Sequence, residues 1–274
     1  MPHQMIVVDC GTPPRMLREL ERLVAGHPDV AWIRSDRFLN VNEIRNRVAA
    51  ATDQDYVCFV ENACEVEAGW LEALIDACEA TGAGIGTPRL EERTPWFRGP
   101  HHDQGFGDIA KEERGGRVVR RIVEVRHTGE DRFRLREPAL VRTFESHCLL
   151  FRRTALSALG PFDEALTAGT HVDMTIAAME KGITAVFVPG SRVTHRPMVL
   201  ARGVDRALFR FRWDPARAAA SRDAIAAKWA IVEGMPDVGD FAWQQHFRTN
   251  PVSWFFSRMF AVTRRVLTRL SPRP

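Results

Sequence analysis

Acidic and histidine side chains stand at the ends of several short apolar runs in this sequence. Asp9 ends the run MIVVD, Glu61 directly follows YVCFV, and His195 ends RVTH. Ligands of open α/β sheets bind beyond the carboxyl ends of parallel strands, so these positions suit binding chemistry. Carboxylates and imidazoles can hold a divalent cation or contact an anionic ligand. Each of the three can also be an ordinary polar residue at a strand end.

A second candidate site lies at the start of the helix expected over His171–Lys181. The segment that opens it is Thr170-His171-Val172-Asp173. A carboxylate at Asp173 or a neutral imidazole at His171 can take a proton from a hydroxyl group, and a helix N-terminus attracts anions. In the simpler interpretation, Thr170 caps the helix and Asp173 stands in a variant of the capping box. Both interpretations can hold together.

The elements that must position these residues alternate along the first part of the chain. The expected strands are Met5–Asp9, Val30–Ile33, Tyr56–Val60 and Ala83–Gly86, and the expected helices are Arg15–Ala25, Asn42–Ala51 and Glu67–Ala80. Such alternation is typical of βαβ units. It predicts an α/β fold with a mostly parallel, doubly wound sheet flanked by helices.

The remainder of the chain divides into an insertion, a second ordered part and a tail. Residues 89–136 form a polar insertion with one hairpin expected, its arms near Val118–Arg126 and Arg132–Arg136. Further strands are expected at Ser146–Arg152, Ala185–Val188 and Arg192–His195, and further helices at Thr154–Leu159, His171–Lys181, Ala201–Phe211, Pro215–Val232 and Val252–Leu270. We therefore expect one domain over residues 1–232 and a helical tail over residues 233–274.

The charge of the chain is unevenly distributed. Six arginines and no acidic residue follow Asp240, so the net charge of +3 divides into +6 for the tail and −3 for the residues before it. Residues 252–270 form an amphipathic basic pattern that suits an anionic membrane surface or a helix packed on the domain. Nucleic acid is not an expected partner, because no recognition motif accompanies the charge. Five cysteines without a CxxC pair and the absence of a signal-like opening predict a cytoplasmic protein. The basic tail would make it peripheral on the inner membrane face.

Three ordered segments carry a resemblance to a known family. They read SHCLLFRRTALSALGPFDEAL, HVDMTIAAMEKG and VFVPGSRVTHRP, and they follow one another between Phe144 and Pro197. This order resembles family 2 glycosyltransferases with the GT-A fold, and GTHVD is similar to bacterial rhamnosyltransferase-like members. The resemblance implies transfer of a sugar, with inversion, from a nucleotide sugar to a hydroxyl acceptor. A lipid-linked glycan or a cell-envelope intermediate would be such an acceptor.

The same resemblance implies roles for individual residues. In the donor site, Asp9 of VVDCGT would read the nucleotide base, and Glu61 with His195 would hold a Mn or Mg ion or the diphosphate. Asp173 or His171 would be the catalytic base. The other donor-binding residues that the resemblance implies are Arg45, Asn46 and Arg196.

The sequence departs from the family pattern at two places. The Asp-x-Asp motif reads Glu61-Asn62-Ala63, and Ala63 has no atom that can bind a metal. The family also usually has a strand and a helix before the VVD segment, which here starts near residue 7. These departures support a second hypothesis, in which the chain is an inactive relative that binds or scaffolds an active enzyme.

Overall fold

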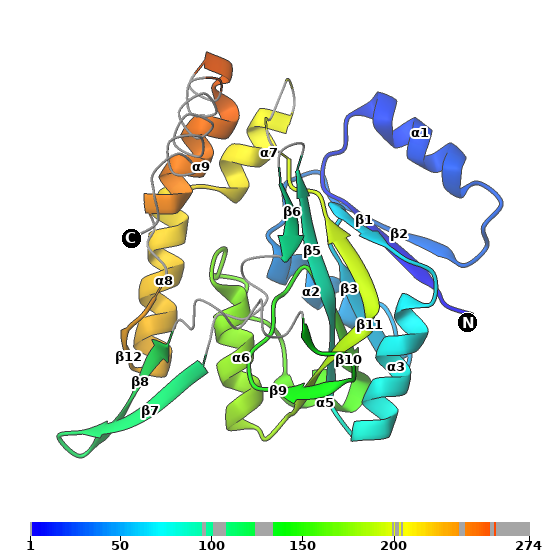
Figure 1. Cartoon of the computed structure of the whole chain (residues 1–274). Helices are drawn as coiled ribbons and strands as arrows, with labels where there is room; N and C mark the ends of the chain where they lie inside the picture. Colours follow the sequence, from blue (N-terminus) through cyan, green and yellow to red (C-terminus); the bar gives the residue numbers. More distant parts are fainter. Residues whose placement is uncertain are drawn as a thin grey trace, which may run out of the picture.

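A computed structural model describes residues 2–94, 97–100, 108–123, 134–198, 200, 203, 205–235, 239–252 and 255. Its central sheet has the strand order β3 (Tyr56–Val60), β10 (Cys148–Arg152), β5 (Ile85–Thr94), β11 (Ala185–His195) and β4 (Cys64–Val66). Two short strands extend it, because β6 (Phe97–Pro100) pairs with β5 and β9 (Ala139–Val141) pairs with β11. A separate parallel pair, β1 (Met5–Asp9) and β2 (Val30–Arg34), lies beside it with α1 (Pro14–Val24) (Figure 1).

The α/β class is confirmed, but the sheet is mixed and the expectation of a mostly parallel sheet was wrong in this respect. β11 runs parallel to β5, whereas β10 runs antiparallel to both β3 and β5. The chain reaches β10 after the long segment between β5 and residue 148, and it enters the sheet from the opposite end. β3, β5 and β11 therefore share one direction, with β10 reversed between them.

Two strands run longer than their sequences predict, because each continues through a proline. β5 passes Pro88, and Pro88 lies opposite Val188 in the pairing with β11. β11 joins the two runs that were expected to be separate strands, and its register shifts between Val188 and Arg192. Since proline cannot donate to the ladder, a local irregularity of this kind accommodates it within the sheet.

Helices cover both faces of the central sheet, which gives three layers. On one face, α3 (Trp70–Thr81) buries Leu74 and Cys78 against β5, β10 and β11. The second core lies on the other face, where α2 (Val41–Ala50), α5 (Arg153–Leu159) and α6 (Thr170–Glu180) pack on the sheet. Its fully buried members include Ile85, Leu149 and Phe151. The apolar periodicity predicted these helices within a few residues of their bounds.

A small sheet within the insertion differs from the hairpin that the sequence predicted. The arms are β7 (Asp108–Arg114) and β8 (Arg117–Val123), joined at Gly115 and Gly116, which both have positive φ. Such a pair of residues suits the two-residue hairpin turn. The turn predicted at residues 128–131 lies outside the described residues. β12 (Ile231–Glu233) adds a third strand, so the domain boundary expected at residue 232 falls within a strand.

The hairpin and the C-terminal helices pack on the side of α6. Ile109 and Ile122 of the hairpin join Ile176 and Ile225 in a third apolar cluster, between α6 and α8 (Pro215–Trp229). α9 (Gly239–Thr249) contacts α7 (Asp205–Arg212) and α8 (Figure 1). Among the described residues, no helix has both the length and the apolar character needed to cross a membrane. The helix expected at 252–270 lies outside the described residues, apart from Val252 and Phe255.

Candidate functional site

Three potential ligand residues meet at one edge of the central sheet. Glu61 follows the last residue of β3, and His195 is the last residue of β11. His147 directly precedes β10, which runs the other way and so begins where β3 and β11 end. One ligand atom from each residue lies within 4.8 Å of the others. The rings of His147 and His195 have centroids 4.2 Å apart. We call these three residues the edge cluster.

Further charged side chains surround the edge cluster. Arg212 of α7 donates through Nη2 to both oxygens of Glu61, at 3.1 and 2.9 Å. His147 Nδ1 bonds to the Glu145 carboxylate, and His147 Nε2 lies 3.8 Å from Glu61 Oε2. Burial lowers the pKa of His147, but the carboxylates of Glu145 and Glu61 outweigh it and raise the pKa to about 9.

The same neighbours keep Glu61 ionised. Burial alone raises its pKa, yet the charges of Arg212 and His147 lower that pKa below its usual value. The site is therefore a network of opposite charges at neutral pH. The two cations, Arg212 and protonated His147, could also bind an anionic ligand, which would take over part of their contact with Glu61 and Glu145.

Arg45 lies beneath this network and supports it. Only 2% of Arg45 is exposed, and its guanidinium donates to Asn42 Oδ1 (3.2 Å), Thr170 Oγ1 (3.4 Å) and the Ser146 carbonyl (3.0 Å). Burial lowers its pKa to about 10, so it stays charged at neutral pH. The bond to Ser146 fixes the residue next to His147. Arg45 thus links α2, α6 and the segment before β10. Its guanidinium donates these hydrogen bonds to groups of the protein itself.

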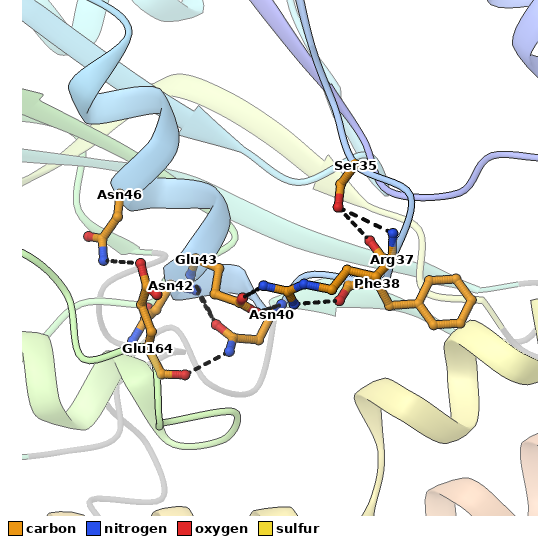
Figure 2. A network of polar contacts seen from close by, with 8 residues as sticks. All are labelled: Ser35, Arg37, Phe38, Asn40, Asn42, Glu43, Asn46 and Glu164. Atoms are coloured by element: carbon orange, nitrogen blue, oxygen red, sulfur yellow. Dashed lines mark hydrogen bonds and ion pairs between the residues drawn. The ribbon is translucent and has the colours of Figure 1, made fainter.

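Asn46 contacts the protein in a similar way. Its side chain donates to the Phe162 carbonyl (2.8 Å) and accepts from the Phe162 N–H (2.8 Å), and it also bonds to Glu164. Asn40 caps α2 in a reciprocal capping box with Glu43, and it too donates to Glu164 (Figure 2). These bonds dock the GPFDE turn on α2. Asn46 therefore fixes the helix that carries Arg45.

Asp9 and Arg196 lie at strand ends, as the sequence predicted. Asp9 is buried at the end of β1, and its Oδ1 accepts the Thr12 N–H at 2.8 Å. Arg196 follows β11, and its N–H donates to the Ala63 carbonyl at 2.7 Å, which ties the Glu61–Ala63 segment to the end of β11. The Arg196 side chain pairs with Glu65 at 2.6 Å.

The two candidate bases occupy the first turn of α6 in different surroundings. Gly169, with φ of 65°, is the N-cap, so the predicted capping by Thr170 was wrong. Asp173 is 6% exposed, and its Oδ1 accepts from Lys228 Nζ (2.8 Å) and Trp229 Nε1 (2.6 Å) of α8. His171 is half-buried and follows Thr170, which Arg45 contacts. The capping glycine can adopt the left-handed backbone without a Cβ penalty.

Sequence reasoning missed His147, Glu145 and Arg212. The strand that follows His147 was expected, but its antiparallel direction was not, and only that direction brings His147 to the edge. Glu145 precedes His147 by two residues and is positioned with it. Arg212 is 151 residues from Glu61 in the sequence, and no local sequence pattern predicts that the two side chains pair.

The donor atoms of the edge cluster suit a divalent metal, although Arg212 already contacts the carboxylate of Glu61. Two imidazoles and one carboxylate suit Mn²⁺ or Zn²⁺, whereas Mg²⁺ prefers an all-oxygen set. Glu61, His147 and His195 would hold such an ion, and Ala63 would contribute no ligand atom. A bound cation would supply positive charge to an anionic leaving group.

Comparisons with known proteins bear on the family and the fold of the chain. The family model described as "Glycosyl transferase family 2" matches residues 1–160. The pre-mycofactocin glycosyltransferase of Mycobacterium tuberculosis is 24% identical over 197 residues, which is 70% of this chain and 37% of that protein. The chain therefore spans little more than a third of the length of this relative.

Solved structures share the fold. GalNAc-T7, crystallised with UDP, GalNAc and Mn²⁺, superposes with a TM-score of 0.53 at 18% identity and covers 71% of this chain and 38% of its own. The 1–349 fragment of Staphylococcus aureus TarS, in complex with UDP-GlcNAc, has a TM-score of 0.50 at 12% identity. It covers 83% of this chain and 62% of its own. These neighbours establish the GT-A architecture.

Proposed function

The chain belongs to glycosyl transferase family 2, and on that basis we propose that it transfers a sugar from a nucleotide sugar to a hydroxyl acceptor, with inversion. The observation that carries this proposal is the meeting of Glu61, His147, His195 and Arg212 at one sheet edge. The neighbours crystallised with UDP and UDP-GlcNAc support a uridine nucleotide as the first donor to test.

At this edge, the proposed role of the protein is electrostatic. A departing nucleoside diphosphate develops negative charge, and fixed positive groups at that position lower the barrier. Arg212 supplies a permanent charge, and His147, whose pKa is raised to about 9, supplies a second one at neutral pH. A divalent cation held by the edge cluster would supply the same kind of charge in place of these two, because its binding would need a neutral His147 and a Glu61 that is released from Arg212.

The proposed base is one of the two residues in the first turn of α6. Two donors from α8 already occupy Oδ1 of Asp173. His171 directly follows Thr170. The Arg45 guanidinium donates both to Thr170 and to the carbonyl of Ser146, the residue before His147. We therefore favour His171 as the group that takes the acceptor proton, with Asp173 as the alternative. Attack by the activated hydroxyl on the face opposite the diphosphate would invert the anomeric centre.

The proposed acceptor is lipid-linked, and the protein would act as a peripheral membrane protein on the cytoplasmic face. Trp243 of α9 is exposed, as are Val252 and Phe255 further along the chain. No acidic residue follows Asp240, and six arginines do. Apolar side chains with arginines and no carboxylates suit the surface of an anionic membrane. Binding to vesicles with and without anionic lipid tests this part of the proposal.

Calorimetric titration of the full chain with UDP-GlcNAc, GDP-mannose and dTDP-rhamnose tests the main proposal. Each titration is run with and without Mn²⁺, and we expect one donor to bind with micromolar to millimolar affinity. Failure of every donor to bind, in either condition, would overturn the transferase proposal. His171→Ala and Asp173→Asn then separate the two base candidates. The true base should lose about 10²-fold or more in turnover with little change in donor affinity.

The alternative proposal is an inactive family member that binds a partner enzyme. Two observations favour it, namely Ala63 in the metal motif and the ion pair that Glu61 already forms with Arg212. Donor titration separates the alternatives, because a scaffold has no need of nucleotide-sugar affinity.

A further inference from the structure

Arg212 occupies the position at Glu61 that an ion in the edge cluster would need. Its Nη2 contacts both carboxylate oxygens at 3.1 and 2.9 Å, so the guanidinium already occupies one acceptor position on each oxygen. The other half of the Arg212 side chain faces solvent, because 51% of the side chain is exposed. The arginine is thus a half-exposed cation in direct contact with the carboxylate of Glu61.

The helix that carries Arg212 is anchored by aromatic contacts. Phe209 is buried, and its ring stacks on Trp213 with centroids 5.9 Å apart. Phe211 contacts Phe38 at 5.5 Å, and the Arg217 guanidinium lies over the Phe211 ring at 4.1 Å. The burial of Phe209 and the contact of Phe211 with Phe38 place α7 independently of the ion pair. A substitution at Arg212 should therefore leave the helix in position.

We propose that Arg212 is an internal counter-ion of Glu61 that keeps divalent cations out of the edge cluster and binds the donor diphosphate in their place. The inference rests on the proposed function for the identity of the anion, but its metal part stands on the geometry alone. Arg212 is a donor-binding and specificity-determining residue in this view. In this member of the family, the cation that contacts the diphosphate would be an arginine side chain and not a metal ion.

Electrostatics explains why the two cations exclude each other. A metal bound by Glu61, His147 and His195 would place two positive charges within a few ångströms of the guanidinium, in a partly buried site where repulsion is strong. The carboxylate would also have to exchange a two-oxygen contact with arginine for a bond to the metal. Arginine suits the diphosphate as well, since its planar guanidinium can bind two oxygens at once.

The test measures Mn²⁺ binding to the full chain by electron paramagnetic resonance, with no donor present. Wild type is compared with Arg212→Gln, Arg212→Lys and the control Arg210→Gln, which changes an exposed residue of the same helix. We expect Arg212→Gln to bind Mn²⁺ at least about tenfold more tightly than wild type, because one positive charge beside the site is gone. Arg212→Lys and Arg210→Gln should bind it as weakly as wild type. Glu61→Gln added to Arg212→Gln should abolish the gain.

The second measurement is UDP binding by calorimetry, with and without Mn²⁺. We expect wild type to bind UDP equally well in both conditions, and Arg212→Gln to bind it more weakly unless Mn²⁺ is added. Equal Mn²⁺ affinities for wild type and Arg212→Gln would overturn the exclusion of metal. UDP binding unchanged in Arg212→Gln without metal would overturn the diphosphate contact. If no variant binds any nucleotide, the proposed function and the diphosphate contact fail together, whereas the metal titration still decides whether Arg212 excludes cations.

Discussion

Two carboxylates in this protein, the part-buried Glu61 and the buried Asp173, are each close to a cation and to a second nitrogen-bearing side chain, yet they serve different parts of the molecule. Glu61 meets Arg212 and His147, which come from separate segments that converge at the sheet edge. Asp173 meets Lys228 and Trp229, which are neighbours at the end of one helix. The first arrangement depends on the whole fold, and the second joins α6 to α8.

The difference teaches how to separate a candidate site from a structural contact. A buried acid that receives an indole N–H and an ammonium from one packed helix has its hydrogen bonds satisfied by that helix. Around Glu61 the charges exceed what packing requires, because Glu145, His147, Arg45 and Arg212 all influence one another. Concentrated opposite charges at the carboxyl end of a sheet are the pattern expected of a ligand site.

The strongest test of this comparison is Glu61→Gln. The variant removes the carboxylate that holds Arg212 and faces His147, so the groups meant for the leaving diphosphate lose their fixed positions. We expect kcat/KM for sugar transfer to fall by about 10³-fold, with only a modest fall in melting temperature because Glu145 still bonds to His147. Asp173→Asn is the matched variant, and there the loss in stability should be clearer than the loss in turnover. A fully active Glu61→Gln protein would remove Glu61 from the site.

The pH dependence of stability gives the second prediction. The folded-state pKa of His147 is about 9, above the value of 6.5 for a free histidine. A raised pKa stabilises the folded state below pH 6.5, and this contribution disappears as the pH rises through 9. We expect the free energy of unfolding to fall by up to about 3 kcal/mol over that range.

Urea unfolding at several pH values measures that slope. His147→Gln serves as the control, because it cannot bind the proton, and its curve should be flatter between pH 6.5 and 9. Identical slopes for the two proteins would mean that His147 is not held protonated by Glu145 and Glu61. In that case the edge cluster would carry less positive charge at neutral pH than the comparison requires.

The sequence predicted the regular parts of the fold because they follow local rules. Tyr56–Val60 is a bounded apolar run, and the stripe of residues 70–78 has helical spacing, so β3 and α3 could be read directly. The prolines at 88 and 189 misled the prediction, because a proline usually ends a strand. Here the pairing between β5 and β11 continues on both sides of them. The direction of β10 was the more serious error, because strand direction depends on how the chain enters the sheet.

The candidate site followed the same division. Glu61 and His195 could be named because each ends a strand, and the resemblance to family 2 enzymes supported them. His147 required the reversed direction of β10, and Arg212 required a contact across 151 residues. Asn46 and Arg45 were placed in the donor pocket by resemblance, and the structure gives their hydrogen bonds to the protein. Side-chain partners of this kind depend on tertiary packing, which local sequence does not encode.

The third prediction concerns the structural member of the pair. Asp173→Ala deletes the acceptor of two hydrogen bonds and leaves the indole N–H of Trp229 inside the α6–α8 contact. We expect the free energy of unfolding to fall by about 2 kcal/mol. The control is Asp223→Ala, which removes an exposed acid paired with its neighbour Arg222, and it should change stability by less than about 0.5 kcal/mol. Equal effects from the two variants would mean that Asp173 does not join the helices.

The smallest expected effect is that of Lys228→Met, and it decides what kind of acid Asp173 is. The Lys228 side chain is 43% exposed, so solvent screens much of its attraction to Asp173. We expect a loss of about 0.5 kcal/mol, whereas Trp229→Phe should cost more because its N–H bond is less exposed to water. A double-mutant cycle with Asp173→Asn measures both couplings. If Lys228 contributes more than Trp229, Asp173 depends on charge in the way Glu61 does, and the α6 turn should then be treated as an extension of the site.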